Sequence, residues 1–300
     1  MNRKRFNIGY FYAIATGVIC AIVPIIFQLV MNQEESIPRA TALFIKFATS
    51  SLILLPITAP KFKKVQFPQG FGWKLPVCAF LFVATLVLLY EGYRYIPPAI
   101  GVSLQYTFPL FTMGFSVLFF RFRCTKQNVL AMLLSLAGVL LLSSGSLNSD
   151  KAYIGIILAL GSAVVYAAYF LWTEHQHLAV MDATVYVTLK TCFSTVFLLL
   201  YILVTNQFTL DVSLRSVLGL ALSGLGTILA SLCLTLAIRH IGSVYTSILG
   251  SIELIVVAIA DALFLGDQLT LRSCIGIAVV LIATILVTLS KQAAKTEQKG

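Results

Sequence analysis

Charge is scarce in this sequence: 11% of its 300 residues are Asp, Glu, Lys or Arg, whereas 59% are apolar. Soluble domains carry roughly a quarter charged residues and about 45–50% apolar ones. The scarcity of charge, together with a mean hydropathy of +0.95, excludes a soluble enzyme and a disordered chain. The net charge of +10 does not indicate a nucleic-acid partner, because the basic residues lie at the ends of apolar runs rather than in one stripe.

Residue patterns that carry chemistry are also few. The six cysteines have no paired spacing, and five of them fall inside apolar runs, so we expect neither a disulfide framework nor a metal site. No His-Glu-x-x-His, Gly-x-Ser-x-Gly or paired-aspartate motif lies in an apolar run, and no phosphate-binding glycine loop occurs. The sequence therefore predicts neither an enzyme nor an ATP-driven pump, and it predicts no cofactor.

Long apolar runs are what the sequence has in abundance. A membrane-spanning helix needs about 20 apolar residues. Ten runs qualify, at 8–30, 40–59, 74–95, 98–120, 127–145, 152–173, 184–204, 216–238, 242–265 and 270–290. The first is too long for a signal peptide and lacks an Ala-x-Ala cleavage pattern, so we expect a retained helix. The connections are short, and we predict an all-α integral membrane protein with ten transmembrane helices that works within the lipid bilayer.

The basic residues predict the orientation of this chain. With the N-terminus inside, 14 Lys and Arg residues fall on the inner side and five on the outer side, and two, Lys46 and Lys190, lie deep within runs. Cytoplasmic ends of membrane helices carry such an excess of positive charge. Both termini are therefore expected in the cytoplasm, and the absence of a targeting extension favours the plasma membrane.

Two halves of the sequence resemble each other. Arg94-Tyr95-Ile96 recurs as Arg239-His240-Ile241 at an offset of 145 residues, and Lys46 with Ser50 recurs as Lys190 with Ser194 at an offset of 144. We expect one five-helix repeat over 1–148, a second over 149–290 and a cytoplasmic tail over 291–300. Because five is odd, the second repeat enters the membrane with opposite orientation, which is the arrangement of many alternating-access transporters.

Several segments also carry a family resemblance. They are Tyr95-Ile96-Pro97-Pro98-Ala99, Tyr106-Thr107-Phe108-Pro109-Leu110-Phe111 and Leu118-Phe119-Phe120 in the first half, and Ala237-Ile238-Arg239-His240-Ile241-Gly242, Gly250-Ser251-Ile252-Glu253 and Leu265-Gly266-Asp267 in the second. Together they resemble the EamA type of the drug/metabolite transporter superfamily. The resemblance implies a ten-helix secondary transporter of small organic metabolites, with export as the usual direction. The chain departs from the family pattern in having Glu253-Leu254 where Glu-Pro is frequent.

Ionisable residues inside the runs are the first candidates for function, since charge within a membrane normally faces a cavity or a partner. Lys46 and Lys190 occupy mirror positions, each with a serine (Ser50, Ser194) four residues on. They either anchor an anionic group of a substrate or a carboxylate, or snorkel to the interface. Glu253 is the deepest charge and is a candidate coupling residue for protons, with a structural ion pair as its alternative. Glu91 is a weaker coupling candidate, because Arg94 lies at i+3.

Helix breakers and aromatic residues complete the candidate site. Pro24, Pro109 and Gly250 lie well inside their runs, where breaks can expose backbone groups for gating and binding. Tyrosines deep in their runs are candidates for contact with a substrate, namely Tyr106, Tyr166 and Tyr245. Those near helix ends are expected to form an interfacial belt, namely Tyr93, Tyr95 and Tyr153.

These observations predict a multi-pass secondary transporter that exports a small organic metabolite, such as an amino acid or an amine, by alternating access. Its partners would be that substrate, a coupling proton and the bilayer, and its oligomeric state is open. The alternatives are an exchanger of nucleotide sugars or phosphorylated metabolites from the same superfamily, and a non-transporting membrane receptor or scaffold.

Overall fold

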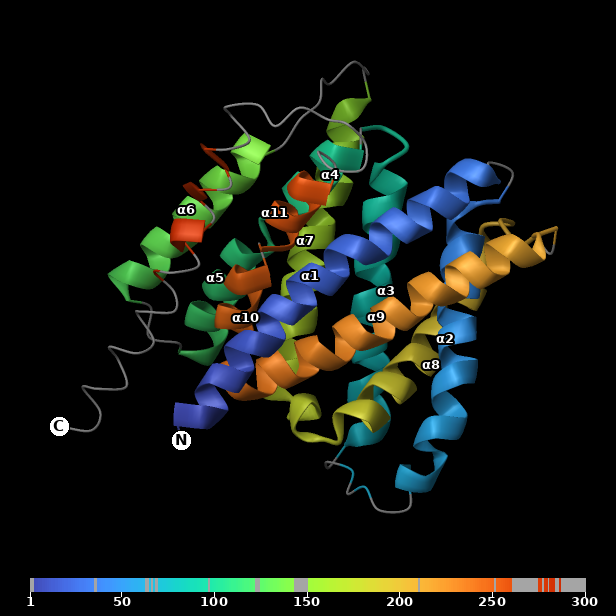
Figure 1. The fold of residues 1–300 in the computed structure, drawn as a ribbon, viewed down its shortest axis with the longest axis horizontal. Helices are drawn as coiled ribbons and strands as arrows, with labels where there is room; N and C mark the ends of the chain where they lie inside the picture. Colours follow the sequence, from blue (N-terminus) through green and yellow to red (C-terminus); the bar gives the residue numbers. More distant parts are fainter. Residues whose placement is uncertain are drawn as a thin grey trace.

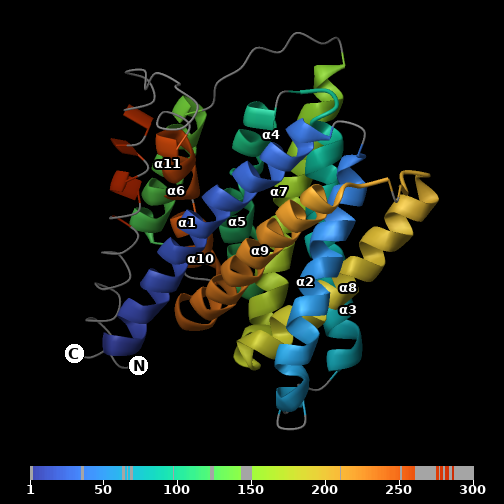
Figure 2. The same ribbon diagram turned by 45° about the vertical axis from the view of Figure 1, so that its right-hand side comes forward.

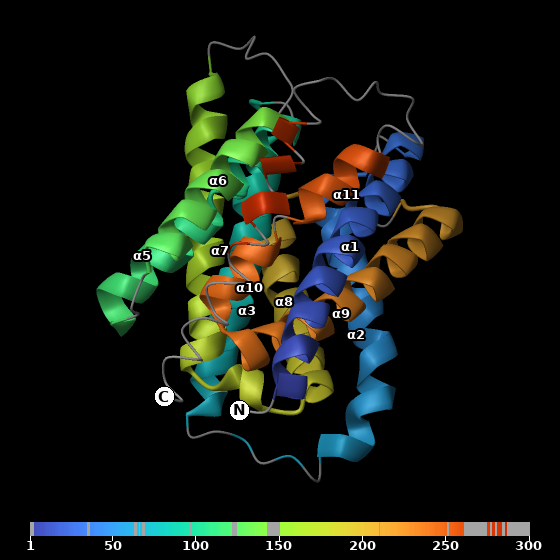
Figure 3. The same cartoon turned by 60° about the vertical axis from the view of Figure 1, so that its left-hand side comes forward.

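The computed structural model is a bundle of α-helices (Figures 1–3). It describes residues 3–34, 37–62, 65, 67, 70–96, 98–121, 125–142, 151–209, 211–250, 252–260, 275–276, 278–279, 281–283 and 286. The helices are α1 (Arg3–Gln33), α2 (Arg39–Phe62), α3 (Phe71–Gly92), α4 (Pro98–Gln105), α5 (Phe108–Phe120), α6 (Lys126–Leu142), α7 (Ala152–His175), a 3₁₀ turn η1 (Leu178–Val180), α8 (Ala183–Val204), α9 (Leu214–Ile241), α10 (Ser243–Gly250) and α11 (Ile252–Ala260).

Among the described residues, seven helical segments are long and apolar enough to cross a membrane. They are Ile8–Met31, Arg39–Phe62, Phe71–Gly92, Ile100–Phe120, Ala152–His175, Ala183–Val204 and Leu214–Ile241, and each coincides with a predicted run. Helix α6 covers most of the predicted run 127–145, and α10 and α11 lie within 242–265. The predicted helix at 270–290 falls largely outside the described residues, as do Cys124, Asp261 and Cys274.

Short polar signals set the helix ends. Asp182 precedes α8, and its Oδ1 accepts hydrogen bonds from the backbone amides of Thr184 and Val185 at 3.0 and 3.1 Å. Ser213 caps α9 in the same way, since its hydroxyl accepts from the amide of Ser216. Gly242 ends α9 with a φ of 83°, a conformation that favours glycine. These caps satisfy amides that would otherwise lack partners.

Two of the predicted spans, 98–120 and 242–265, are each divided into two helices, beside the helix breakers Pro109 and Gly250 that the sequence singles out. Helix α4 ends at Gln105 and α5 begins at Phe108, because Pro109 in the first turn of α5 has no amide to continue the preceding helix. The second break follows Gly250, a weak helix former. The offset of 145 residues carries Pro98–Gln105 onto Ser243–Gly250, the bounds of α10.

The helices pack in corresponding pairs. Helix α1 lies along α9, α3 lies along α7, and α2 packs on α8 (Figures 1 and 2). Two glycines allow close approach: a Cβ on Gly9 would lie 2.6 Å from Cγ2 of Ile241, and a Cβ on Gly155 would lie 2.8 Å from Cγ2 of Ile96. Small residues at helix contacts are typical of membrane proteins. The two contacted isoleucines are the pair that the sequence repeat relates.

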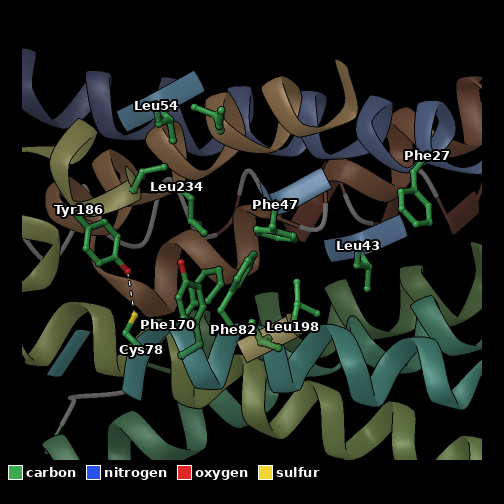
Figure 4. Packing of buried hydrophobic residues seen from close by; sticks show 14 of the residues in the cluster. Phe27, Leu43, Phe47, Leu54, Cys78, Phe82, Phe170, Tyr186, Leu198 and Leu234 are labelled. Carbon is green, nitrogen blue, oxygen red and sulfur yellow. Dashed lines mark hydrogen bonds between the residues drawn. The ribbon is translucent and has the colours of Figure 1, made fainter. Parts of the chain in front are cut away.

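The interior combines apolar packing with hydroxyl contacts. Figure 4 shows Phe47 and Phe82 in the centre of the cluster, and the Tyr186 hydroxyl hydrogen-bonded to Cys78. The rings of Phe47 and Phe82 lie 5.8 Å apart. Between α2 and α8, Ser51 is hydrogen-bonded to Thr195 at 3.0 Å, and Thr58 donates to Thr188 at 3.1 Å. Such bonds help to hold helices together where the surroundings are apolar.

Candidate functional site

The two helix breaks lie close together in the interior. A Cβ on Gly250 would lie 3.8 Å from Cζ of Phe108, which begins α5. Helix α1 passes the second break closely, because a Cβ on Gly17 would lie 3.2 Å from the amide nitrogen of Glu253. The Glu253 carboxylate, in the first turn of α11, has the Tyr106 hydroxyl as its hydrogen-bonding neighbour. Each break thus contributes one polar side chain to the same place.

Lys190 of α8 is enclosed by side chains from three other helices. Its Nζ donates hydrogen bonds to the hydroxyls of Tyr169 and Ser231, at 3.1 and 3.2 Å, and lies 4.2 Å from the ring centroid of Phe82. The residue is 1% exposed. Neutral hydroxyls and an aromatic ring therefore surround this ammonium group, and a ring face attracts a cation.

Lys46 of α2 lies in a similar environment. It is 7% exposed, and its Nζ lies 5.6 Å from the ring centroid of Phe27. Ser50, predicted to share its polar face, donates its hydroxyl hydrogen bond to the Lys46 carbonyl at 2.7 Å. The buried hydroxyl of the corresponding Ser194 has no hydrogen-bond partner among the described residues.

The charges of this region are not paired with one another. Within the described part of the chain, neither Lys46 nor Lys190 has a carboxylate oxygen within 4.0 Å. Cys20 of α1 lies within electrostatic range of both lysines and of Glu253. We call the group formed by Cys20, Lys46, Tyr106, Tyr166, Lys190 and Glu253 the central site. Snorkelling would place the ammonium groups at the interface, whereas both lysines are buried in the bundle.

The candidate tyrosines divide between two places. The Tyr106 ring lies 6.1 Å from that of Phe108, which in turn lies 4.8 Å from Tyr166. Both tyrosines therefore belong to the central site. Tyr245 instead packs with Tyr10 and Ala13 of α1 near the start of α10, and the structure does not bring it to the central site.

The remaining candidates lie elsewhere. Glu91 is engaged near the end of α3: its Oε2 lies 3.0 Å from Nη1 of Arg94, and its Oε1 accepts from the hydroxyl of Tyr201 at 2.8 Å. This is the local ion pair that the spacing allows. Pro24 is exposed on α1, which continues through it as a helix. Pro109 is buried at the start of α5.

Sequence reasoning missed the residues that hold the lysines. Tyr169 could have been added to the candidate site, because it lies three residues after Tyr166, and residues three apart lie on the same face of a helix. Phe27, Phe82 and Ser231 gave no signal, since such residues are common throughout apolar helices. Their role follows only from the packing of distant helices.

Both halves of the chain match one family of known proteins. The sequence profile of the EamA-like transporter family matches residues 7–144 and again residues 153–289. The chain belongs to the EamA-like transporter family. It is therefore a multi-pass membrane transporter, and its named relatives indicate a transporter rather than an enzyme.

Relatives of this EamA-like protein come from bacteria and a plant. The uncharacterized transporter sll1319 of Synechocystis sp. is 25% identical over 75% of this chain and 69% of its own length. The uncharacterized transporter YvbV of Bacillus subtilis is 24% identical over 85% of this chain and 84% of its own length. The WAT1-related protein At5g40210 of Arabidopsis thaliana is 23% identical over 77% of this chain and 73% of its own length. A solved crystal structure at 15% identity superposes with a TM-score of 0.76 over 96% of this chain and 99% of its own, which shows a shared fold.

Proposed function

We propose that this EamA-like protein is a ten-helix secondary transporter in which two inverted five-helix repeats alternate access to the central site. The packing of α1 on α9 and of α7 on α3 supports the repeat, as do the helix breaks at corresponding positions. Two similar bundles that lean on each other have two arrangements of comparable energy, and broken helices commonly mark the binding site between them.

The observation that carries this proposal is the pair of buried lysines without carboxylate partners in the described residues. An unpaired ammonium group in a membrane interior is costly, so these cations are retained for a negative charge that arrives with the substrate. A small metabolite with a carboxylate, such as an amino acid, supplies that charge. Glu253 adds an acidic group that can carry a proton, and export coupled to protons is the mode of transport we propose.

The same lysines serve the alternative of an exchanger for phosphorylated metabolites or nucleotide sugars, because a phosphate group also matches a buried cation. A receptor or scaffold has no need of alternating access. Counterflow in proteoliposomes separates these functions: liposomes loaded with one unlabelled compound are tested for accumulation of its labelled form. Amino acids, amines and sugar phosphates form the panel, and accumulation that requires both lysines supports the proposal. A scaffold gives no accumulation with any compound.

A further inference from the structure

A cavity apart from the central site lies at the end of the bundle where α2 begins and α3 and α8 end. Its volume is about 440 Å³, within the range of sites for small molecules. Its lining includes Arg39 and Leu43 of α2, Tyr90, Glu91 and Tyr93 of α3 or just beyond, and Tyr201 of α8. None of these six side chains belongs to the central site. The cavity wall thus combines three tyrosine rings with three charged side chains, those of Arg39, Glu91 and Arg94.

Among the described residues, one positive charge of this cavity has no carboxylate partner. Arg94 and Glu91 form an ion pair, and the Tyr201 hydroxyl occupies the second oxygen of that carboxylate. Arg39 has no carboxylate oxygen within 4.0 Å among the described residues. Its guanidinium carbon lies 6.0 Å from the ring centroid of Tyr93, and Tyr90 is also within its electrostatic range. A guanidinium group has a planar fork of donors that matches a carboxylate.

This cavity is aligned with the central site. Arg39 and Lys46 are seven residues apart on α2, so they share a helix face about 10 Å apart, with Leu43 between them. The rings of Tyr93 and Tyr90 lie 5.4 Å apart, those of Tyr90 and Phe27 lie 5.8 Å apart, and Phe27 lies against Lys46. Leu43, Phe27 and Tyr90 therefore form a thin layer between two cations.

We propose that the cavity at Arg39 is a second binding site, which takes a small organic monocarboxylate with an apolar or aromatic body. One unpaired guanidinium matches a single negative charge, and the tyrosine rings receive the rest of the molecule. The place of this site at the outer end of a transport route, one layer from Lys46, rests on the proposed function. Binding of a carboxylate at Arg39 does not depend on the proposed function.

The test uses 4-fluorobenzoate as the probe and measures its dissociation constant by fluorine NMR with the purified full chain in lipid nanodiscs. The Lys46→Met, Lys190→Met double variant removes the cations of the central site. Any carboxylate binding that persists in this variant is therefore attributed to the cavity at Arg39. Adding Arg39→Gln to it should weaken binding about tenfold or more, because a charge-assisted hydrogen bond is lost. Arg39→Lys should restore part of the affinity.

Two controls decide whether charge in the cavity is the cause. Arg215→Gln removes an exposed guanidinium from the start of α9, outside the cavity lining, and should leave binding unchanged. The neutral 4-fluorobenzamide should bind weakly whether residue 39 is Arg or Gln. The proposal is overturned if Arg39→Gln binds 4-fluorobenzoate as tightly as its parent, if the amide binds equally well, or if monodisperse parent protein binds no probe. A failure of counterflow would remove the transport function and leave this measurement intact.

Discussion

Ser51 and Thr195 are hydrogen-bonded to each other at 3.0 Å, and they are also related by the 144-residue offset between the halves. A residue that contacts its own counterpart lies on the axis that relates two repeats. Seven residues after Ser51 and seven before Thr195, Thr58 meets Thr188, so α2 and α8 run antiparallel. Lys46 and Lys190 each precede this crossing by five residues. They therefore lie on opposite sides of it, separated by about 15 Å along the helices.

The close helix contacts give a prediction about stability. Gly9→Ala and Gly155→Ala should each destabilise the protein by about 1–3 kcal/mol, because the added methyl group would overlap an isoleucine. That isoleucine is Ile241 at the end of α9 for Gly9, and Ile96 in the turn after α3 for Gly155. Gly114→Ala is the matched control, since a Cβ at Gly114 of α5 meets nothing within 4 Å. Thermal unfolding of the purified variants in one detergent measures the difference. Equal melting temperatures for all three would show that neither contact is tight.

The hydroxyl contacts of Lys190 give a second prediction. Tyr169→Phe removes one hydrogen-bond acceptor from the ammonium group while keeping the ring, so it should cost about 1–3 kcal/mol of stability. Lys190→Met in the same background should recover part of that loss, because it removes the buried charge that lacks a partner. A double-mutant cycle of melting temperatures measures this coupling. Strictly additive effects would contradict the contact.

Glu253 gives a prediction about coupling. Glu253→Gln keeps the shape of the side chain and a hydrogen-bond acceptor for Tyr106, but it cannot release or take up a proton. We expect transport driven by a pH gradient to be lost while substrate exchange continues. Gradient-driven transport and substrate exchange are compared in proteoliposomes with and without an imposed pH gradient. Glu91→Gln is the control, because the Glu91 carboxylate is held by Arg94 and Tyr201. Gradient-driven uptake by Glu253→Gln at the rate of the parent would assign this carboxylate a structural role.

Much of the fold could be predicted from the sequence, because apolar runs of about 20 residues have few other uses. The lysine pair was also visible, since a buried cation repeated at a fixed offset stands out in an apolar chain. The helix breakers Pro109 and Gly250 were visible in the sequence as well, whereas the residues at which the helices end beside them were not, because the apolar runs continue through both breaks. Depth along a run also says nothing about the neighbours of a side chain, which is why Tyr245 was grouped with Tyr106. The partners of Lys190 come from helices far apart in sequence, and only tertiary packing reveals them.

The positions of Lys46 and Lys190 on opposite sides of the α2–α8 crossing predict opposite accessibility. In alternating access, the outer part of the central site is open to water while the inner part is closed, and the inner part is open while the outer part is closed. Cysteines at positions 46 and 190, placed singly in a chain with its six native cysteines replaced, should therefore react with a charged, membrane-impermeant thiol reagent in different states. Position 46 should react in the outward-open state and position 190 in the inward-open state.

Matched positions on the lipid-facing surface make this experiment decisive. Leu52 of α2 and Val196 of α8 are 71% and 51% exposed and lie close to the same depth as the crossing residues. Cysteines there face lipid tails, so they should resist a charged reagent in every state. Equal reaction at 46 and 190 in every state would indicate a static water-filled opening. No reaction at either position would mean that both lysines stay enclosed as the structure shows them. Positions 46 and 190 lie on opposite sides of the crossing that Ser51 and Thr195 hold, so they face opposite ends of the central site. Opposite changes in their reactivity therefore require the two repeats to move against each other.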